Sequence, residues 1–524
     1  MTVRIFFFSL FLLSWVPLNF AEEVLVKVKS VNTIAHTDDN FVCATLDWWP
    51  SDKCNYGECP WIEAGILNLD LENPNLGKAI KAFNPLRVRV GGSLQDQVVY
   101  HVGKVKKCPH FKIKGDGLFG FSKGCLPMDR WNALHHLLSD NGALVTFGLN
   151  ALYGRQQHPN KTEWTGPWDS SNARDFINYT ISNAQKIDSW EFGNELSGSG
   201  IAASVNPTQY GQDLIDLKKV VTELYNSSSM PQPKILAPGG FFDRDWFIKL
   251  LESSGSGVVD VLTHHIYNLG AGNDPIVPNR MVDPFYLSEI AETYKSIQLT
   301  IQDFGPWSAA WVGEAGGAYN SGGPNVSNAF IDSFWYLDQL GMTSSYNHKA
   351  YCRQSLVGGN YGLLDTTTFV PNPDFYSALL WHRLMGKRVL GVEVDNAPYL
   401  RAYAHCAKNK AGVMLLFINL SNSTTFNVSM ENDMNIFTTS SSDKVAKDVV
   451  SQTGSKREEY HLTPKNGNIF SRVMLLNGSP LELTKAGEIP AISPLSIDSD
   501  SPILIAPRSI AFVRLPDFKA PACA

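Results

Sequence analysis

Ser-Trp-Glu-Phe-Gly-Asn-Glu, residues 189–195, is the stretch that decides the fold we expect for this chain. Its first four residues are of the kind that fill a buried strand, and the Gly-Asn-Glu after them marks a turn at the end of that strand. Asn206, Pro207 and Thr208 come shortly afterwards, and they are typical of the start of a helix. A strand followed by a helix is the repeating unit of a parallel sheet.

The same unit of strand and helix recurs along the first two thirds of the chain. We expect strands at residues 44–48, 86–90, 143–148, 189–193, 234–237, 258–264, 310–313 and 343–351. Amphipathic stretches lie between them, for example at residues 128–139 and 208–225. Eight such units in about 300 residues predict an α/β fold of the (β/α)8 TIM-barrel type, which we place at residues 41–385.

The pattern changes after residue 385, where helical periodicity fades. Strand-like runs at residues 399–405, 412–420, 426–430, 472–476 and 503–514 are separated by Asn, Ser, Gly and Pro. They predict an all-β sandwich domain at residues 386–524. Residues 24–30 are also strand-like, so we expect the segment 22–40 to add an N-terminal strand to that sandwich. The polar residues 438–456 are expected to form a loop.

The first 21 residues are typical of a signal peptide, because Arg4 precedes an apolar run at residues 5–16 that is too short to cross a bilayer. A membrane anchor or a buried helix is the alternative. Asn-x-Ser/Thr triplets, the acceptor sites of N-glycosylation, begin at Asn160, Asn178, Asn226, Asn325, Asn419, Asn422, Asn427 and Asn477. We therefore expect a secreted protein of the extracellular matrix or cell wall, with a lysosome or vacuole, and peripheral membrane association, left open.

The net charge and the spacing of histidines argue against two classes of protein, nucleic-acid-binding proteins and metal-binding proteins. The net charge of the 524 residues is −6, whereas a nucleic-acid-binding protein is usually basic. His264 and His265 lack a third ligand at a suitable spacing, so we expect no metal and no cofactor. Eight cysteines in a secreted chain favour disulfides. The pairs closest in sequence are Cys54 with Cys59 and Cys108 with Cys125.

Two of the predicted strands are followed by a carboxylate. The fourth ends at Glu195 and the seventh at Glu314, and active sites of TIM barrels lie at these ends of the strands. Hydrolysis of a glycoside requires two carboxyl groups, one to protonate the leaving oxygen and one to attack the sugar. A single Glu at a strand end is more often a helix cap or an ion-pair partner. Glu191, inside the strand, is expected to be structural.

The two glutamates need different environments if they are to do different work. Burial should raise the pKa of Glu195, whereas Glu314 should stay ionised, held by donors such as Tyr267. Asn194 precedes the acid and can hydrogen-bond the 2-hydroxyl group of a sugar. Carboxyl groups about 5–5.5 Å apart would give retention of configuration.

Six stretches agree in order and spacing with a known family. They are Ala-Thr-Leu-Asp at 44–47, Leu-Arg-Val-Arg-Val-Gly-Gly-Ser at 86–93, Phe-Gly-Asn-Glu at 192–195, His-His-Ile-Tyr at 264–267, Trp-Val-Gly-Glu at 311–314 with Ala-Tyr at 318–319, and Gly-Asn-Tyr at 359–361. They resemble the heparanase family of endo-β-glucuronidases, glycoside hydrolase family 79, and especially its plant heparanase-like branch. The resemblance implies a barrel with a sandwich built from both termini, and a bridge between Cys406 and Cys523.

The resemblance also implies roles for the matching residues. Glu195 corresponds to the proton donor and Glu314 to the nucleophile. The residues that correspond to sugar-hydroxyl contacts are Asp47, Ser93 and Asn194. The residues placed at the recognition site for the glucuronate carboxylate, or beside it, are Tyr361, Tyr319, Asn320 and Ser321. A phenol and backbone N–H groups can bind such a carboxylate without a full cationic partner.

Some positions depart from the animal heparanases. Ser93 stands where they have Thr, a change that keeps the hydroxyl. Asn320-Ser321 stands where they have Gly-Gly, a change expected to narrow the cleft or to shift an endo-acting site toward exo action. The lysines between residues 104 and 114 do not match the family's heparin-binding clusters. We therefore expect glucuronate on arabinogalactan-type or other wall glycans, on a proteoglycan, or in a small glucuronide as substrate, in preference to heparan sulfate.

The sequence thus predicts a retaining β-glucuronidase or endo-β-glucuronidase. A non-catalytic glycan-binding protein on the same scaffold is one alternative. Another retaining glycosidase of the same barrel class, such as an arabinofuranosidase or a xylosidase, is the second. Endo or exo action and the oligomeric state are left open.

Overall fold

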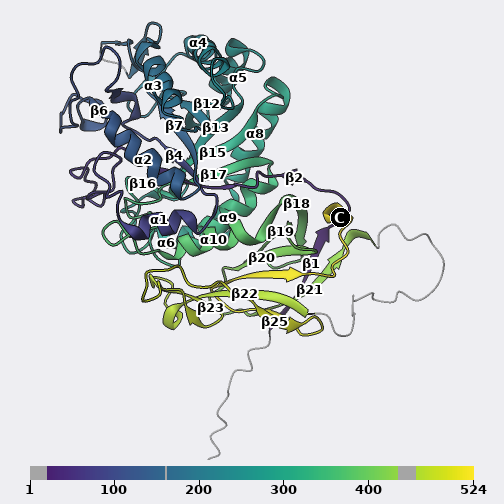
Figure 1. Cartoon of the computed structure of the whole chain (residues 1–524). Coiled ribbons are helices and arrows are strands. Elements are labelled where there is room, and N and C mark those ends of the chain that lie inside the picture. Colours follow the sequence, from purple (N-terminus) through teal and green to yellow (C-terminus); the bar gives the residue numbers. More distant parts are fainter. Residues whose placement is uncertain (1–20, 160–161, 435–455) are drawn as a thin grey trace, which may run out of the picture.

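The computed structural model describes residues 21–159, 162–434 and 456–524. The predicted signal peptide (apart from residue 21), Asn160 and nearly all of the loop predicted at 438–456 lie outside the described residues. Figure 1 shows a barrel surrounded by helices and, below it in this view, a body of strands that contains the C-terminus. Over the described ranges, no helix has the length and apolar character needed to cross a membrane.

Parallel strands close the barrel in the order β10, β12, β13, β15, β17, β3, β4 and β7. In chain order these strands are β3 (Val42–Leu46), β4 (Arg87–Val90), β7 (Leu144–Leu149), β10 (Ser189–Phe192), β12 (Lys234–Phe241), β13 (Val261–Ile266), β15 (Ala309–Ala315) and β17 (His348–Arg353). The helices that follow them are α1 (Pro74–Lys81), α2 (Met128–Asp140), α3 (Ser171–Ser182), α4 (Pro207–Asn226), α5 (Arg244–Ser254), α8 (Ala291–Phe304), α9 (Asp332–Ser345) and α10 (Pro373–Leu384). The predicted TIM barrel is confirmed.

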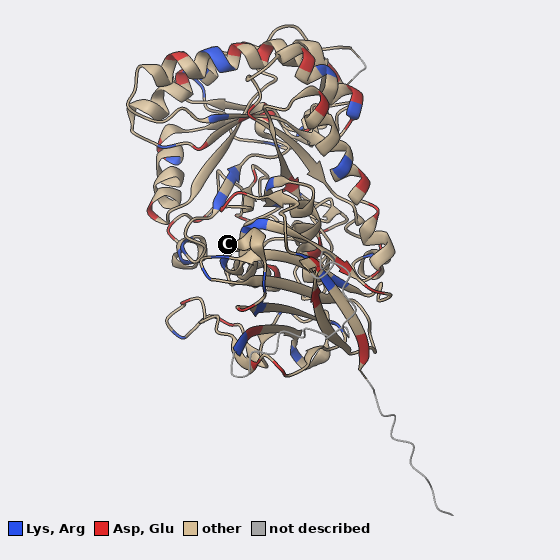
Figure 2. Cartoon of the chain, turned by 90° about the vertical axis from the view of Figure 1, so that its right-hand side faces the viewer, with Lys and Arg blue, Asp and Glu red and all other residues tan. Residues whose placement is uncertain are grey.

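Short elements lie in the segments that lead from a barrel strand to the next helix. They are β5 (Val98–Tyr100), β6 (Gly124–Leu126), β8 (Gln156–Gln157), β9 (Glu163–Thr165), β11 (Ser204–Val205), β14 (Gly270–Ala271), β16 (Ala318–Tyr319), α6 (Val277–Arg280) and α7 (Pro284–Ser288). These segments build the rim around the C-terminal ends of the barrel strands, where TIM-barrel enzymes carry their active sites. On the helices outside the barrel, acidic and basic residues are interspersed (Figure 2).

Among the barrel strands, the largest boundary differences from the sequence prediction are at the start of β17 and at the end of β12. β17 begins at His348, because the residues that were expected to start it, 343–345, complete α9. β12 continues four residues beyond the predicted end, to Phe241. Its register to β13 shifts between Pro238 and Gly240. This extension carries the end of β12 up to the rim of the barrel.

The second body is built from antiparallel and parallel strands of both chain ends. Its path of paired strands is β24 (Ser479–Pro480), β23 (Met474–Leu476), β22 (Lys456–Pro464), β27 (Ser509–Leu515), β20 (Val413–Asn419), β19 (Leu400–Ala407), β18 (Met385–Val394), β1 (Glu22–Lys29), β21 (Phe426–Asn432) and β26 (Ile503–Ile505). Beside this path, β2 (Ala35–His36) pairs with β18, and β25 (Leu495–Asp498) pairs with β22.

The long strand β18 turns this path into the predicted sandwich. Its first half pairs with β19 and its second half with β1, so the chain passes from one layer to the other within one strand. Val26 of β1, Phe417 of β20 and Val428 of β21 belong to one buried apolar cluster between the layers. β1 therefore contributes an N-terminal strand to the core of the C-terminal body.

Disulfides join the cysteines in pairs. They are Cys43–Cys352, Cys54–Cys59, Cys108–Cys125 and Cys406–Cys523. The two short-range pairs and the bridge expected from the resemblance are among them. Cys43–Cys352, which the sequence did not single out, joins β3 to β17, the first and last strands of the barrel.

One of the predicted glycosylation sites does not fit this fold. The side chain of Asn419 is fully buried, and its Nδ2 donates to the carbonyl oxygens of Thr424, Ile505 and Ala506 at 2.8–3.0 Å. Because Nδ2 is the atom that would carry the glycan, the prediction for Asn419 is corrected. Asn178, Asn226, Asn325 and Asn422 are exposed, and Asn427 and Asn477 are half-buried.

Candidate active site

The two glutamates singled out by the sequence face the same space at the C-terminal end of the barrel. Glu195 lies three residues after β10, and Glu314 is the sixth residue of β15. Their residues are 8% and 4% exposed. A carboxylate oxygen of each and a ring nitrogen of His265 all lie within 4.8 Å of one another.

The backbone around Glu195 takes a turn that few residues adopt. Glu195 has φ +55° and Gly193 has φ +73°. A Cβ on Gly193 would lie 2.7 Å from the Tyr210 hydroxyl, so the position needs glycine for space as well as for conformation. The Glu195 N–H donates to the Gly239 carbonyl of β12 at 2.7 Å. Because a left-handed non-glycine residue costs about 1–3 kcal/mol, this tie helps to hold the acid in place.

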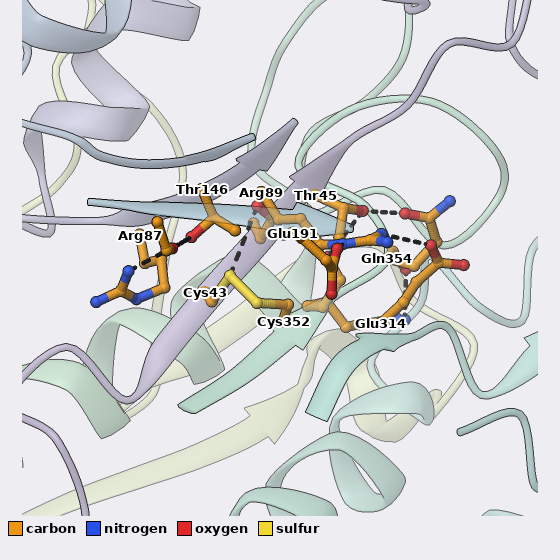
Figure 3. Close-up of a disulfide and its surroundings, with 12 residues drawn as sticks. Cys43, Thr45, Arg87, Arg89, Thr146, Glu191, Glu314, Cys352 and Gln354 are labelled. Atoms are coloured by element: carbon orange, nitrogen blue, oxygen red, sulfur yellow. Dashed lines mark hydrogen bonds and ion pairs between the residues drawn. A yellow bond between two sulfur atoms is a disulfide. The ribbon is translucent and has the colours of Figure 1, made fainter. Parts of the chain in front are cut away.

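Glu314 is held by one cation and one hydroxyl. Arg89 Nη1 donates to Oε2 at 2.7 Å, and Tyr267 OH donates to Oε1 at 2.7 Å. Arg89 Nε also pairs with Glu191 at 2.5 Å, so Glu191 has the structural role that was expected of it. Figure 3 shows Arg89, Glu191 and Glu314 gathered beside the Cys43–Cys352 disulfide. These two donors fix the position of both Glu314 carboxylate oxygens.

Glu195 has a different environment. Its Oε1 lies 3.0 Å from His265 Nδ1. Burial raises the pKa of Glu195 to about 7, although the charge of Arg89 opposes this rise. Burial lowers the pKa of His265 to about 4, so the imidazole is neutral near neutral pH and adds no positive charge beside the acid. Glu195 can therefore carry a proton under conditions in which an exposed glutamate has lost it.

Asn194 is oriented from two sides. Its Oδ1 accepts from Arg89 Nη2 at 2.8 Å, and its backbone N–H donates to Asp96 at 2.8 Å. Its Nδ2 is buried and has no partner within the described part of the chain. A buried donor of this kind calls for an acceptor, and a sugar hydroxyl beside Glu195 would supply one.

Asp47 forms the opposite part of the site. Its Oδ1 accepts from Trp48 N and its Oδ2 from Gln354 Nε2, at 2.6 and 2.8 Å. Burial, followed by the charge of Glu314, raises the pKa of Asp47 to about 8. A Cβ on Gly92 would lie 2.4 Å from the Asp47 carboxylate. Ser93, which is half-buried, directly follows this glycine.

The residues expected at a glucuronate carboxylate lie on the loops after β15 and β17. Tyr361 is buried against Trp61, and Trp61 Nε1 donates to Ser321 Oγ at 3.0 Å. Asn320 and Ser321 have φ values of +57° and +74°. Asn320, Ser321 and Asn360 also line a cavity of about 370 Å³. Tyr319 is 44% exposed, and its carbonyl oxygen accepts from the Gly272 N–H.

Three side chains of the site carried no role in the sequence prediction. Arg89 lies in one of the matching stretches, and its presence in a buried strand was the available signal, because a buried arginine needs carboxylate partners. His265 was weighed only as a metal ligand. Gln354 follows β17, and its Oε1 accepts from Thr45 Oγ1 while its Nε2 holds Asp47. Thr45 and Gln354 are 309 positions apart in the chain, so no local sequence pattern indicates this contact.

Glu195, His265 and Glu314 form a cluster of the kind that can bind a metal ion. Two observations favour acid–base chemistry here. Glu314 already pairs with the guanidinium of Arg89, whose charge would repel a cation. Glu195 and His265 also share a hydrogen bond that a metal would have to break. The same three groups suit one protonated and one ionised carboxyl group.

Two buried carboxyl groups with opposed environments at the mouth of a TIM barrel define a glycoside hydrolase of the two-carboxylate class. Residues 23–341 match the family model described as glycosyl hydrolase family 79, N-terminal domain. Heparanase-like protein 1 of Arabidopsis thaliana is 56% identical over 95% of this chain and 94% of its own. Baicalin-beta-D-glucuronidase of Scutellaria baicalensis is 40% identical over 94% and 92%.

A solved structure supports the fold alone. The 4-O-alpha-L-rhamnosyl-beta-D-glucuronidase of Fusarium oxysporum 12S superposes with a TM-score of 0.65 over 94% of this chain and 100% of that chain, at 14% identity. The chain belongs to glycosyl hydrolase family 79. It is a glycoside hydrolase, as the sequence predicted.

Proposed function

We propose that this chain hydrolyses β-glucuronosyl linkages with retention of configuration, with Glu195 as acid and base and Glu314 as nucleophile. The observation that carries the proposal is the contrast at the site: Glu314 accepts from Arg89 and Tyr267, whereas burial raises the pKa of Glu195 to about 7. The closeness of their oxygens, within 4.8 Å, also favours retention, because an inverting enzyme keeps its carboxyl groups about 6.5–9.5 Å apart.

The first step breaks the glycosidic bond. Glu195 gives its proton to the leaving oxygen while a Glu314 oxygen bonds to the anomeric carbon and forms a glycosyl-enzyme. In the second step Glu195, now ionised, takes a proton from water, and that water displaces Glu314 from the sugar. Asn194 Nδ2 is available to the 2-hydroxyl group in both steps, a contact that strengthens as the anomeric carbon becomes cationic.

We propose that the uronate is recognised on the side of the site opposite Glu195. Asp47 and Ser93 would contact sugar hydroxyls, and the Tyr361 hydroxyl with the backbone at Asn320 and Ser321 would bind the carboxylate. The left-handed backbone at Asn320 and Ser321 supports this, because successive N–H groups in such turns form concave anion sites. The side chain of Asn320 donates to Tyr56 OH at 2.8 Å and thereby lies across this loop.

The experiment compares the wild type and Glu314→Gln on matched aryl glycosides. The panel contains a β-glucuronide, the β-glucoside that lacks only the carboxylate, an α-arabinofuranoside and a β-xyloside. We expect the glucuronide to be hydrolysed best and the variant to lose that activity. Equal background release by both proteins would favour a binding protein, and preference for a pentoside would overturn the substrate.

The glycan that carries the glucuronate is a further part of the proposal. We propose an unsulfated wall glycan or a small glucuronide, because no Lys or Arg is among the residues that line the 370 Å³ cavity next to Asn320. Product sizes from a glucuronate-bearing polymer test this, since release of monosaccharide alone indicates exo action and shorter chains indicate endo action.

We also propose that the chain matures in the secretory pathway. The four disulfides support this, because such bonds persist in oxidising compartments. Removal of N-glycans from the natively produced protein should increase its mobility on a denaturing gel. An unchanged mobility together with free thiols would contradict the proposal.

A further inference from the structure

Phe241 is an exposed aromatic residue at the edge of the site, and the steps proposed above give it no part. It is the last residue of β12, the strand whose Gly239 holds the Glu195 N–H. The six residues before it are buried, whereas Phe241 is 38% exposed. A single exposed apolar side chain is common on protein surfaces, so what distinguishes Phe241 is its place next to the buried catalytic groups.

The backbone of Phe241 is fixed against the acid. A Cβ on the neighbouring Gly240 would lie 3.2 Å from Glu195 Cα and 2.5 Å from Ser197 Oγ, so the two segments are in close contact. Ser197 Oγ donates to the Phe241 carbonyl oxygen at 2.9 Å. The segment after the acid and the end of β12 are thus in contact, and the backbone of Phe241 has a defined place beside Glu195.

The ring of Phe241 packs near two of the side chains that contact the catalytic carboxyl groups. Its centroid lies 6.4 Å from the ring of His265 and 6.2 Å from that of Tyr267. His265 contacts Glu195, and Tyr267 donates to Glu314. The ring therefore borders the place where the bond is cleaved, on the side of the barrel that carries the acid.

The opposite side of the barrel carries the groups assigned to the uronate. In the closed order of strands, β12 lies between β10 and β13, while β3 and β17, which precede Asp47 and Tyr361, lie across the barrel. A sugar held by Asp47 and Tyr361 directs its leaving oxygen toward Glu195. Because the Glu195 N–H is bound to Gly239 of β12, a leaving group at Glu195 lies close to the end of that strand.

We infer that Phe241 is the platform on which the leaving group rests, and that this subsite takes a leaving group with a flat apolar face. An aromatic ring and the C–H face of a pyranose share that chemistry. The inference rests on the proposed function, since it needs Glu195 to be the acid. It extends that function by naming the residue that sets aglycone specificity.

The test compares three glucuronides in the wild type and in Phe241→Ala. Naphthyl β-glucuronide offers an aromatic leaving group, a glucuronosyl-β-galactose disaccharide offers a pyranose face, and β-glucuronosyl fluoride offers a single atom. Because an aromatic contact is worth about 0.5–1.5 kcal/mol, we expect kcat/KM for the preferred leaving group to fall roughly three- to tenfold. The fluoride should lose at most about twofold. Whichever of the first two falls more identifies the natural kind of leaving group.

Two further variants complete the experiment. Phe241→Trp should keep the preference, and Phe241→Leu, which is apolar but not flat, replaces the alanine variant if that protein is less stable. Phe470 is 44% exposed and lies on a loop of the C-terminal body, so Phe470→Ala is the matched control and should behave as wild type.

Losses that are equal for the three substrates, or absent, would overturn this inference and leave the proposed function standing. If the wild type cleaved none of the three, the proposed function would fall first and this inference with it.

Discussion

Glu195 and Glu314 are the same type of residue in two different environments, and the difference between the environments assigns their roles. Glu314 accepts hydrogen bonds from the guanidinium of Arg89 and the hydroxyl of Tyr267. Glu195 has a neutral imidazole beside it and a pKa that burial raises to about 7. Both residues are almost fully buried, so burial alone does not separate them. The Arg89 guanidinium is hydrogen-bonded to Glu314, whereas its charge acts on Glu195 only from a distance.

The largest effect is expected from removing the group that must be ionised. Glu314→Ala should lower kcat/KM for an aryl glucuronide by more than about 10⁴-fold, because no glycosyl-enzyme can form. Added azide should then produce the α-glucuronosyl azide by direct attack on the open face. Glu252→Ala, a change at an exposed glutamate on α5, is the control. A β-azide from Glu314→Ala would reverse the assignment.

Removing the acid should have a large effect that depends on the leaving group. Glu195→Ala should lose about 10²- to 10⁴-fold with a poorly acidic alcohol as leaving group and far less with dinitrophenol, which departs without protonation. Azide should rescue this variant as the β-azide, since the glycosyl-enzyme still forms. A loss that is the same for both leaving groups would show that Glu195 is not the acid.

A moderate effect should follow from weakening the support of Glu314. Tyr267→Phe removes one hydrogen bond to the carboxylate, and because a bond to a charged group contributes about 1.5–3 kcal/mol, we expect kcat to fall roughly 10- to 100-fold. Tyr399→Phe, at a tyrosine that is 43% exposed, is the matched control. Unchanged kcat in Tyr267→Phe would mean that Arg89 alone holds the nucleophile.

The smallest expected effect is the response to pH. Glu195 must be protonated to act as an acid, and its raised pKa keeps the proton up to about pH 7. Above that value kcat/KM should fall about tenfold for each pH unit. The fall should vanish in Glu195→Ala assayed with dinitrophenyl glucuronide. A fall that persists there would belong to another group, such as Asp47, whose pKa burial raises to about 8.

The barrel could be predicted because its strands are short apolar runs that end in turn residues, a local signal that repeats. β18 and β22 carried no such signal. β18 starts directly after α10 with no turn residue between them, and β22 reads Lys-Arg-Glu-Glu-Tyr-His-Leu-Thr-Pro, in which charged residues hide the alternation. Both strands form because their neighbours in the sheet cover them, which is tertiary information.

The same limit explains what was predicted of the site. Glu195 and Glu314 could be singled out because each comes at the end of an apolar, strand-like run and close to a glycine, which is a local pattern. The contacts that distinguish them come from β4 and β13, far away in sequence. Asn419 shows the reverse case: its triplet is complete, yet the fold buries the side chain.

The Cys43–Cys352 bridge makes the barrel a covalently continuous ring, because β3 and β17 meet at the one seam that no βα connection spans. It encloses a separation of 309 residues, for which the chain-entropy relation gives at most about 6 kcal/mol of stabilisation. Cys352 is two residues from Gln354, which holds Asp47. Loss of this bridge should therefore act on the sugar site through Gln354 and Asp47, and lower substrate affinity more than turnover.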